Sequence, residues 1–195
     1  AGPSGMSAAI VDSNGEYGAV IVSAANLNIA AHQVTVPEGT SLVLLQNEIP
    51  DEVNLAVALK AKAIGAKVWL NAAPARKISN DLVEAIDLLI VNKVEAEFYA
   101  RAGFAVNLLK TLGEDGVSYK GVQYSGFPVD VVSTHGAGDM FVGALASQVV
   151  YGTNMVGAIK FAQAAAALHV SSQLDKRKKL NNQAVTTFLA AQDKR

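Results

Sequence analysis

The sequence predicts an α/β fold, a mostly parallel sheet flanked by helices in a three-layer, Rossmann-type arrangement. Between residues 41 and 111, short apolar runs alternate with segments whose apolar residues recur at helical spacing. Such alternation is typical of parallel strands joined by right-handed crossovers. The runs contain few polar residues, as expected for strands that are covered on both faces.

The individual elements follow from this pattern. We expect strands over residues 41–46, 67–70, 88–91 and 106–111. Helices are expected over residues 51–65 and 79–87, the second capped by Ser79 or Asn80, with one short helix within residues 92–105. A turn at residues 111–116 then leads to an antiparallel pair, 117–120 with 122–124, and to helices over residues 154–170 and 181–191.

The first 30 residues have a different pattern. Residues 5–23 alternate around Asp12-Ser13-Asn14-Gly15, and an Asn-Gly connection of this kind predicts a β-hairpin. An isolated hairpin is barely stable in water, so this one must pack on something or pair with another chain. We therefore divide the chain into a hairpin region, residues 1–30, and an α/β domain, residues 31–195.

Composition excludes several classes of function. Of the 195 residues 51% are hydrophobic and the net charge is -1, which argues against a nucleic-acid partner. No apolar run reaches the ~20 residues of a membrane helix, and the first five residues do not resemble a signal peptide. The absence of cysteine fits a reducing compartment, so we expect a cytoplasmic protein. Since residue 1 is not Met, we expect the natural protein to begin further upstream.

The most informative stretch is residues 129–151, which predict a strand over 129–132, a turn at Gly136-Ala137-Gly138-Asp139, and a helix. A helix that begins on glycines can bind an anion with its first backbone amides. The charge of Asp139 would repel that anion, so a role as general base is the functional interpretation. The turn is neither a Walker loop nor a dinucleotide fingerprint, because the lysine and the glycine spacing are wrong. The alternative is a plain helix start capped by the aspartate.

Three further polar segments follow expected strands: Gln46-Asn47-Glu48, residues 92–95 and residues 111–116. Ligands of parallel α/β sheets bind at such strand ends. Asn92 and Glu95 have the spacing of a capping box, and the alternative is that they help to hold a hydrated magnesium ion.

The remaining polar candidates have weaker signals. The spacing around His32, His135 and His169 does not suggest a metal site. His169 is expected to be structural or solvated, and His135 a turn residue or a catalytic group. We expect the basic cluster at residues 176–179 to form a solvated loop between helices, and the alternative is that it contacts phosphates.

The motifs together resemble the ribokinase branch of the PfkB sugar kinase family. Ser133-Thr134-His135-Gly136-Ala137-Gly138-Asp139 is similar to the family's second signature, usually Asp-Thr-x-Gly-Ala-Gly-Asp. Collinear similar blocks lie at residues 45–50, 70–75, 92–95, 111–113 and 161–167.

The resemblance implies an ATP-dependent kinase that phosphorylates the primary hydroxyl of a pentose such as ribose. Asp139 would be the base, and Gly136, Ala137 and Gly138 would form the anion hole for the transferring phosphate. The resemblance assigns the other roles as follows: Asn92 and Glu95 to magnesium and the phosphates, Thr111, Gly113 and Gly116 to the nucleotide, Gln163 to the adenine surroundings, and Glu48 to the sugar. The hairpin resembles part of a lid that also serves relatives as a dimer surface, which implies a homodimer.

The departures from the family pattern limit these expectations. The family's amino-terminal third, with the motif that grips the sugar, has no counterpart here, so we expect this chain alone to show weak or no kinase activity. Ser133 replaces an aspartate that in relatives helps form a monovalent-cation site, and residues 171–175 lack the family's Gly-Ala-Gln. Both argue against cation activation. The alternative function is a non-catalytic nucleotide-binding module, and the identity of the sugar stays open.

Overall fold

The computed structural model describes residues 2–11, 17–101, 103 and 107–192. The chain forms two compact units. The first comprises Ala1–Leu89 and Phe98–Val106, and the second comprises Ile90–Glu97 and Asn107–Arg195. The division at residue 30 that we expected from the sequence stays a prediction.

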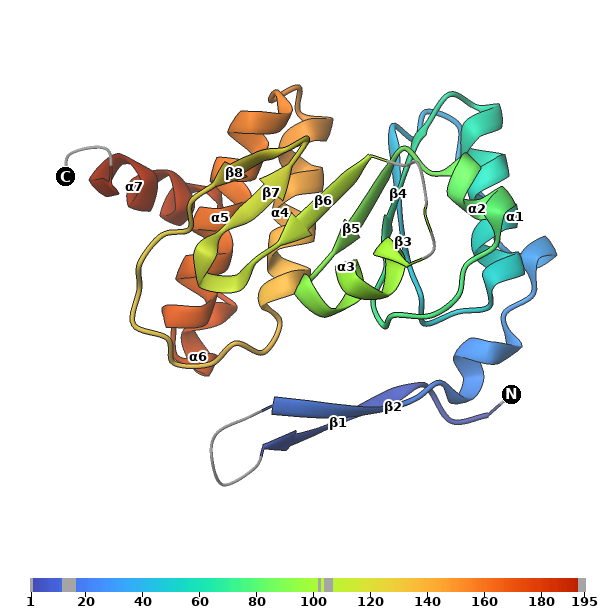
Figure 1. Ribbon diagram of the computed structural model, residues 1–195, viewed down its shortest axis with the longest axis horizontal. Helices are drawn as coiled ribbons and strands as arrows, with labels where there is room; N and C mark the ends of the chain where they lie inside the picture. Colours follow the sequence, from blue (N-terminus) through green and yellow to red (C-terminus); the bar gives the residue numbers. More distant parts are fainter. Residues whose placement is uncertain (1, 12–16, 102, 104–106, 193–195) are drawn as a thin grey trace. The chain divides into compact units, whose positions relative to one another are not determined.

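A six-stranded sheet confirms the predicted fold class (Figure 1). Its strand order is β3-β4-β5-β6-β7-β8. The strands are β3 (Leu42–Gln46), β4 (Lys67–Asn71), β5 (Leu88–Val91), β6 (Leu108–Thr111), β7 (Val117–Tyr119) and β8 (Val122–Tyr124). β3 and β4 pair in parallel, whereas β6, β7 and β8 pair antiparallel. A helix connects each pair of successive strands from β3 to β6, as in parallel sheets, so the sheet is mostly parallel, with the expected hairpin at one edge.

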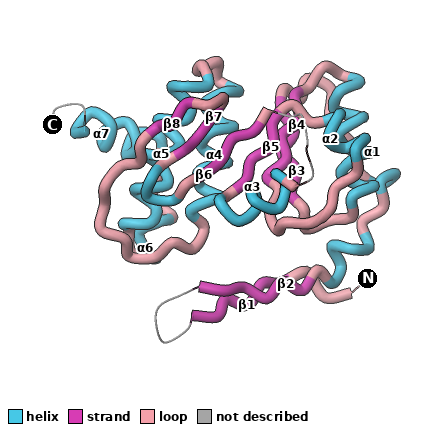
Figure 2. Tube along the Cα trace, in the orientation of Figure 1, coloured by secondary structure: helices cyan, strands magenta, loops and turns pink. Residues whose placement is uncertain are grey.

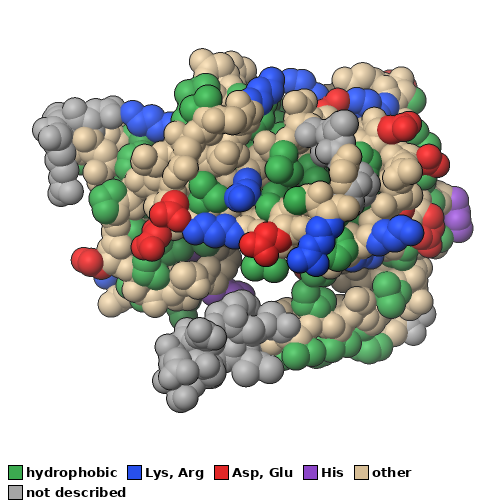
Figure 3. Space-filling view, in the orientation of Figure 1, with side chains coloured by type: hydrophobic (Ala, Val, Ile, Leu, Met, Phe, Trp, Pro, Cys, Tyr) green, Lys and Arg blue, Asp and Glu red, His purple; other side chains and the backbone are tan. Residues whose placement is uncertain are grey.

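The predicted amino-terminal hairpin is present as a separate two-stranded sheet. β1 (Met6–Val11) pairs antiparallel with β2 (Tyr17–Val22), in a register that places Met6 opposite Val22. The predicted Asn-Gly turn lies outside the described residues. Met6, Val20, Ile21 and Val22 are all exposed, and Figure 3 shows apolar side chains at the surface of this segment. The homodimer expected through this hairpin stays a prediction, which sedimentation analysis would test.

In the first unit, α1 (Asp51–Ala63) packs on β3, β4 and α2 (Asn80–Ala85). α1 buries Val53, Val57 and Ala61, which lie four residues apart and so share one helix face. Two short 3-10 helices precede β3, η1 (Ala24–Asn28) and η2 (Ala31–Gln33). The Ser79 hydroxyl caps α2 as predicted, because its oxygen accepts a hydrogen bond from the Leu82 N–H at 3.3 Å.

In the second unit, α4 (Ala137–Val150) packs on α5 (Met155–Ser171), and α7 (Asn182–Gln192) packs on α5. A shorter helix, α6 (Leu174–Arg177), lies between α5 and α7 in the chain. Ala164, Ala165 and Val185 form a buried cluster. Phe127 and Phe188 pack against it and contact each other edge to face. The remaining elements are α3 (Lys93–Ala100), whose residues belong to both units, and the 3-10 helix η3 (Gly113–Asp115).

Two predictions about strands were wrong. Residues 125–136 form a loop and contain no strand, although Val129 to Val132 are β-branched or short polar residues (Figure 2). Val131 and Val132 are exposed and so lack the side-chain packing that stabilises β-branched residues in a strand. β3 was expected to be covered on both faces, but it lies at a sheet edge, where Leu44 is 42% exposed.

Among the described residues, no helix combines the length and apolar character needed to cross a bilayer.

Candidate functional site

The predicted glycine turn initiates α4 in the second unit. Gly136 is the N-cap residue and has a left-handed backbone with a φ of 75°. The N–H groups of the first helical turn have no acceptor within the helix, so they can bind an anion from outside. The Ala137 N–H, however, already donates to the Thr134 carbonyl at 3.1 Å. Of the three residues predicted for an anion hole, Gly138 therefore fits the role best. We call residues 133–139 the glycine loop.

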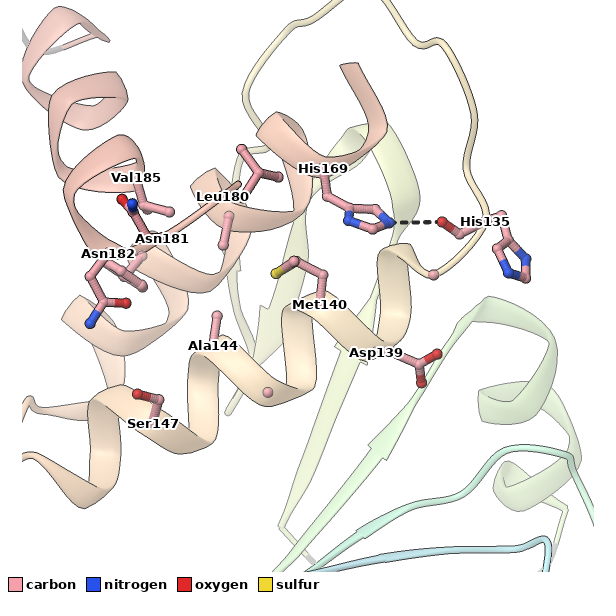
Figure 4. A pocket seen from close by; sticks show the side chains of 14 residues that line it. His135, Asp139, Met140, Ala144, Ser147, His169, Leu180, Asn181, Asn182 and Val185 are labelled. Carbon is pink, nitrogen blue, oxygen red and sulfur yellow. Dashed lines mark hydrogen bonds between the residues drawn. The ribbon is translucent and has the colours of Figure 1, made fainter. Parts of the chain in front are cut away.

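Asp139 lies in the first turn of α4 and its side chain is exposed. In Figure 4 its carboxylate points away from Met140 and His169, which lie on another side of the helix. An exposed carboxylate beside the first amides of a helix could accept a proton from an incoming hydroxyl. The geometry is thus compatible with the predicted role of a base.

A cavity of about 620 Å³ lies between α4, α5 and the start of α7 (Figure 4). Among the predicted site residues it touches Gly136 and Asp139 only. Most of its wall is formed by apolar or small side chains such as Met140, Ala144 and Phe161. The cavity therefore does not gather the other polar residues predicted to bind the nucleotide.

Asn92 and Glu95 form the capping box that their spacing predicted. The Asn92 N–H donates to the Glu95 Oε2 at 2.8 Å, and the Glu95 N–H donates to the Asn92 Oδ1 at 2.8 Å. Glu95 is buried, and burial raises the pKa of its carboxyl group from the usual value of 4.5, while the hydrogen bond from Asn92 acts in the opposite direction. The described residues contain no group of three or more acidic or histidine side chains suited to hold a metal ion.

The start of α3 contacts the loop that follows β6. The Lys93 Nζ lies 2.7 Å from the Asp115 Oδ2, and the Thr111 hydroxyl donates to the Val91 carbonyl at 3.3 Å. Within the 111–116 loop, the Leu112 N–H donates to the Gly116 carbonyl at 2.8 Å. The structure thus brings two of the predicted polar segments together, residues 92–95 and residues 111–116.

The backbone of Gly116 in this loop lies close to the side chain of Gln163 in α5. A Cβ atom at Gly116 would meet the Tyr124 carbonyl oxygen, the Gly126 nitrogen at 2.5 Å and the Gln163 Nε2 at 2.7 Å. Gln163 is buried and donates from Nε2 to the Tyr124 and Ser125 carbonyls, at 2.9 and 3.1 Å. These bonds use both amide protons of Gln163, so it supports the end of β8 and the residue that follows it. A contact of Gln163 with adenine stays a prediction.

Glu48, predicted to face the sugar, is half-buried after β3 and belongs to the first unit. In that unit, the neighbouring Asn47 donates from Nδ2 to the Pro74 carbonyl at 3.1 Å and to the Tyr99 hydroxyl at 2.8 Å. Two of the segments that carried the resemblance, residues 45–50 and 70–75, are therefore joined directly. The role of Glu48 stays a prediction.

The residue that sequence reasoning missed is Arg177. It was assigned to a solvated basic loop, but it ends α6, is half-buried, and donates to carbonyl oxygens of the glycine loop. His169 was expected to be structural or solvated, and its Nε2 indeed lies 2.8 Å from the His135 carbonyl (Figure 4). Only the position of Arg177 within a basic cluster marked it in the sequence, and such clusters are usually solvated.

Comparison with known proteins places these features in a family. Residues 2–179 match the pfkB family of carbohydrate kinases. The chain is 33% identical over 179 residues to the ribokinase of Bacillus subtilis (strain 168), covering 84% of this chain and 61% of that protein. It is 31% identical over 197 residues to the ribokinase of Arabidopsis thaliana, covering 86% of this chain and 52% of that protein. The chain thus spans about half to two thirds of the length of these relatives.

Solved structures have the same fold. The ribokinase of Thermotoga maritima matches with a TM-score of 0.81 at 28% identity, covering 97% of this chain and 70% of that one. The Arabidopsis thaliana ribokinase complexed with ribose and ATP matches with a TM-score of 0.78 at 29% identity, covering 96% of this chain and 70% of that one. With a glycine turn at the start of α4, an aspartate in the first helical turn and this extent of similarity, the chain belongs to the pfkB family of carbohydrate kinases.

Proposed function

We propose that this chain carries the ATP-binding part of a sugar kinase that transfers the γ-phosphoryl group to the primary hydroxyl of a pentose such as ribose. The observation that supports this proposal best is the start of α4, where Gly136 turns the backbone and Asp139 follows in the first turn. Membership of the pfkB family and the ribose and ATP in the Arabidopsis complex support the same reaction class.

The proposed reaction needs little covalent chemistry from the protein. The amides at the start of α4, Gly138 foremost, would stabilise the charge on the transferring phosphoryl group. Asp139 would accept the proton of the attacking sugar hydroxyl, whose oxygen then forms the bond to phosphorus while the bond to the ADP oxygen breaks. Thr111, Gly113 and Gly116 would line the nucleotide, and Glu48 would contact the sugar.

A magnesium ion fits Asn92 and Glu95 only indirectly. The Asn92 Oδ1 and the Glu95 Oε2 already accept backbone hydrogen bonds at 2.8 Å. A carboxylate has further lone pairs, so Glu95 would bind a water molecule of hydrated magnesium rather than the ion itself. When bound with ATP, magnesium would neutralise phosphate charge.

Substitution of Asp139 tests the proposal. We expect Asp139→Asn to leave Mg-ATP binding intact in calorimetry and to lower ribose-dependent phosphoryl transfer by about 10²- to 10⁴-fold. Asp130→Asn is the matched control, because Asp130 is an exposed carboxylate in the preceding loop. Since this chain alone is expected to turn over weakly, transfer should be measured as [γ-³²P]ATP incorporation over long times.

The alternative is a nucleotide-binding module without catalysis. It would show Mg-ATP binding, no ribose-dependent transfer above background, and no effect of Asp139→Asn. Robust ribose phosphorylation by the 195-residue chain would contradict the expectation of weak activity. The cytoplasmic location stays a prediction of the sequence.

A further inference from the structure

Three backbone carbonyl groups of the second unit converge on one side chain, the guanidinium of Arg177. Its Nη2 donates to the Ser133 carbonyl at 2.7 Å, and its Nη1 donates to the His135 carbonyl at 2.8 Å. Its Nε donates to the Ser172 carbonyl at 3.3 Å. Two of these oxygens belong to the glycine loop and the third follows the end of α5.

Converging carbonyl oxygens favour a group that offers several N–H donors, and a positive charge strengthens these bonds. Each carbonyl presents the negative end of its dipole, and the C-terminal end of α5, where Ser172 is the cap residue, adds the negative end of the helix dipole. Guanidinium suits this arrangement because it is planar, carries five N–H donors and no acceptor, and keeps its charge. The charge-assisted hydrogen bonds of Arg177 are therefore stronger than the contacts that a fully exposed basic side chain makes.

The bonds of Arg177 act on the backbone from which α4 begins. His135 directly precedes Gly136, the N-cap residue of the helix, and Ser133 lies three residues before it. The N–H groups of Val132 and Ser133 also donate to the Val170 carbonyl, at 2.8 and 3.1 Å. The glycine loop is thus attached to the end of α5 by the Val170 carbonyl, by the His169 Nε2, which lies 2.8 Å from the His135 carbonyl, and by the charged side chain of Arg177.

A monovalent cation, against which the departures from the family pattern already argued, does not fit the same place. The carbonyl oxygens of Ser133, His135 and Ser172 are already bound to Arg177, and a second positive charge there would be repelled. Ser133 also lacks the carboxylate that relatives carry at this position.

We propose that the Arg177 guanidinium is a built-in cation that positions the glycine loop, so that this loop needs no bound monovalent ion. The expected use of the loop, to bind a phosphate of ATP, rests on the function proposed above. The ordering of the loop by Arg177 does not, because it can be measured without any nucleotide.

Amide hydrogen exchange on the intact chain tests this proposal in KCl, NaCl and choline chloride of equal ionic strength. The reporters are the N–H groups of Ala137 and Met140, which donate to the carbonyls of Thr134 and Gly136. In the wild-type chain we expect their exchange to be independent of the cation. In Arg177→Met we expect exchange about tenfold faster, with part of the protection restored by K⁺ and not by choline.

Lys178→Met is the matched control, because Lys178 is the exposed neighbour of Arg177 in the same basic cluster. It should exchange like the wild type. Faster wild-type exchange in choline than in KCl would overturn the proposal, and so would an Arg177→Met variant with unchanged exchange. Should Arg177→Met fail to fold, the wild-type cation series decides alone. A wild-type chain that does not bind Mg-ATP, but whose amide exchange is the same in all three salts, would contradict the proposed function and leave this inference standing.

Discussion

Two loops of the second unit, both predicted to contact the nucleotide, are held in different ways. The 111–116 loop is held by close backbone packing, because Gly116 has no room for a side chain between Tyr124, Gly126 and Gln163. The glycine loop is held by a charged side chain from α6, since Arg177 binds two of its carbonyl oxygens. Steric packing is insensitive to salt and charge, whereas a charged clamp depends on one residue far along the chain. A side chain added at Gly116 should therefore destabilise the 111–116 loop, and removal of the Arg177 charge should destabilise the glycine loop.

The largest effect on folding is expected from Gly116→Ala. Its backbone has a φ of 97°, and the new Cβ would overlap backbone atoms that cannot move away. Overpacking together with left-handed strain should cost about 3 kcal/mol of unfolding free energy, measured by urea denaturation.

Gly113→Ala is the matched control for this substitution. Gly113 also has a positive φ, 69°, but a Cβ there meets nothing within 4 Å. It should cost about 1 kcal/mol, the strain alone. Equal losses at the two positions would show that crowding does not hold the 111–116 loop.

A smaller and pH-dependent effect is expected from Glu95→Gln. Burial raises the pKa of Glu95 in the folded chain above its usual 4.5, so the folded state binds the proton more tightly than the unfolded state. Wild-type stability should therefore fall as pH rises from 4.5 through the raised value, and stay constant above it. The amide that replaces the carboxyl group in the variant cannot ionise, although its carbonyl oxygen can still accept the Asn92 N–H.

Urea unfolding of both proteins as a function of pH measures this difference. The stability of Glu95→Gln relative to the wild type should increase over that interval and then level off. Parallel curves would mean that Glu95 ionises in the folded chain as easily as in the unfolded one. Arg177 stays charged throughout, so this pH dependence distinguishes the start of α3 from the glycine loop.

The smallest effect is expected from Lys93→Met, which removes the ion pair between α3 and the 111–116 loop. The two side chains are 56% and 55% exposed, so water screens the pair despite its 2.7 Å separation. The change in unfolding free energy should lie within about 0.5 kcal/mol. A larger loss that disappears in Asp115→Asn chains would show that charge, and not only packing, holds this loop.

Local patterns predicted much of the molecule. Period-two alternation predicted β1 and β2, and the spacing of Asn92 and Glu95 predicted a capping box that both residues form. The glycine turn predicted the start of α4. In each case residues a few positions apart interact with one another, so their sequence spacing already contains the geometry.

Predictions failed where the outcome depends on distant parts of the chain. The valines of residues 129–132 have the propensity of a strand, but no strand in the described part of the chain pairs with them, and they form part of a loop. Leu44 lies in an apolar run, yet its strand is at a sheet edge. Strand pairing and burial depend on the neighbouring strands and helices. These come from other parts of the chain, so a single run of residues does not reveal them.

The sequence by itself determined the fold class, the helix that begins on glycines and the resemblance to sugar kinases, because periodicity, capping and short motifs are local properties. The tertiary structure alone decided how the candidate loops are supported. It placed the buried amide of Gln163 against the segment after β8, and the guanidinium of Arg177 on three carbonyl oxygens. Most of the carbonyl groups that these two side chains bind lie far from them in the sequence. Only folding brings the donors and acceptors within hydrogen-bonding distance.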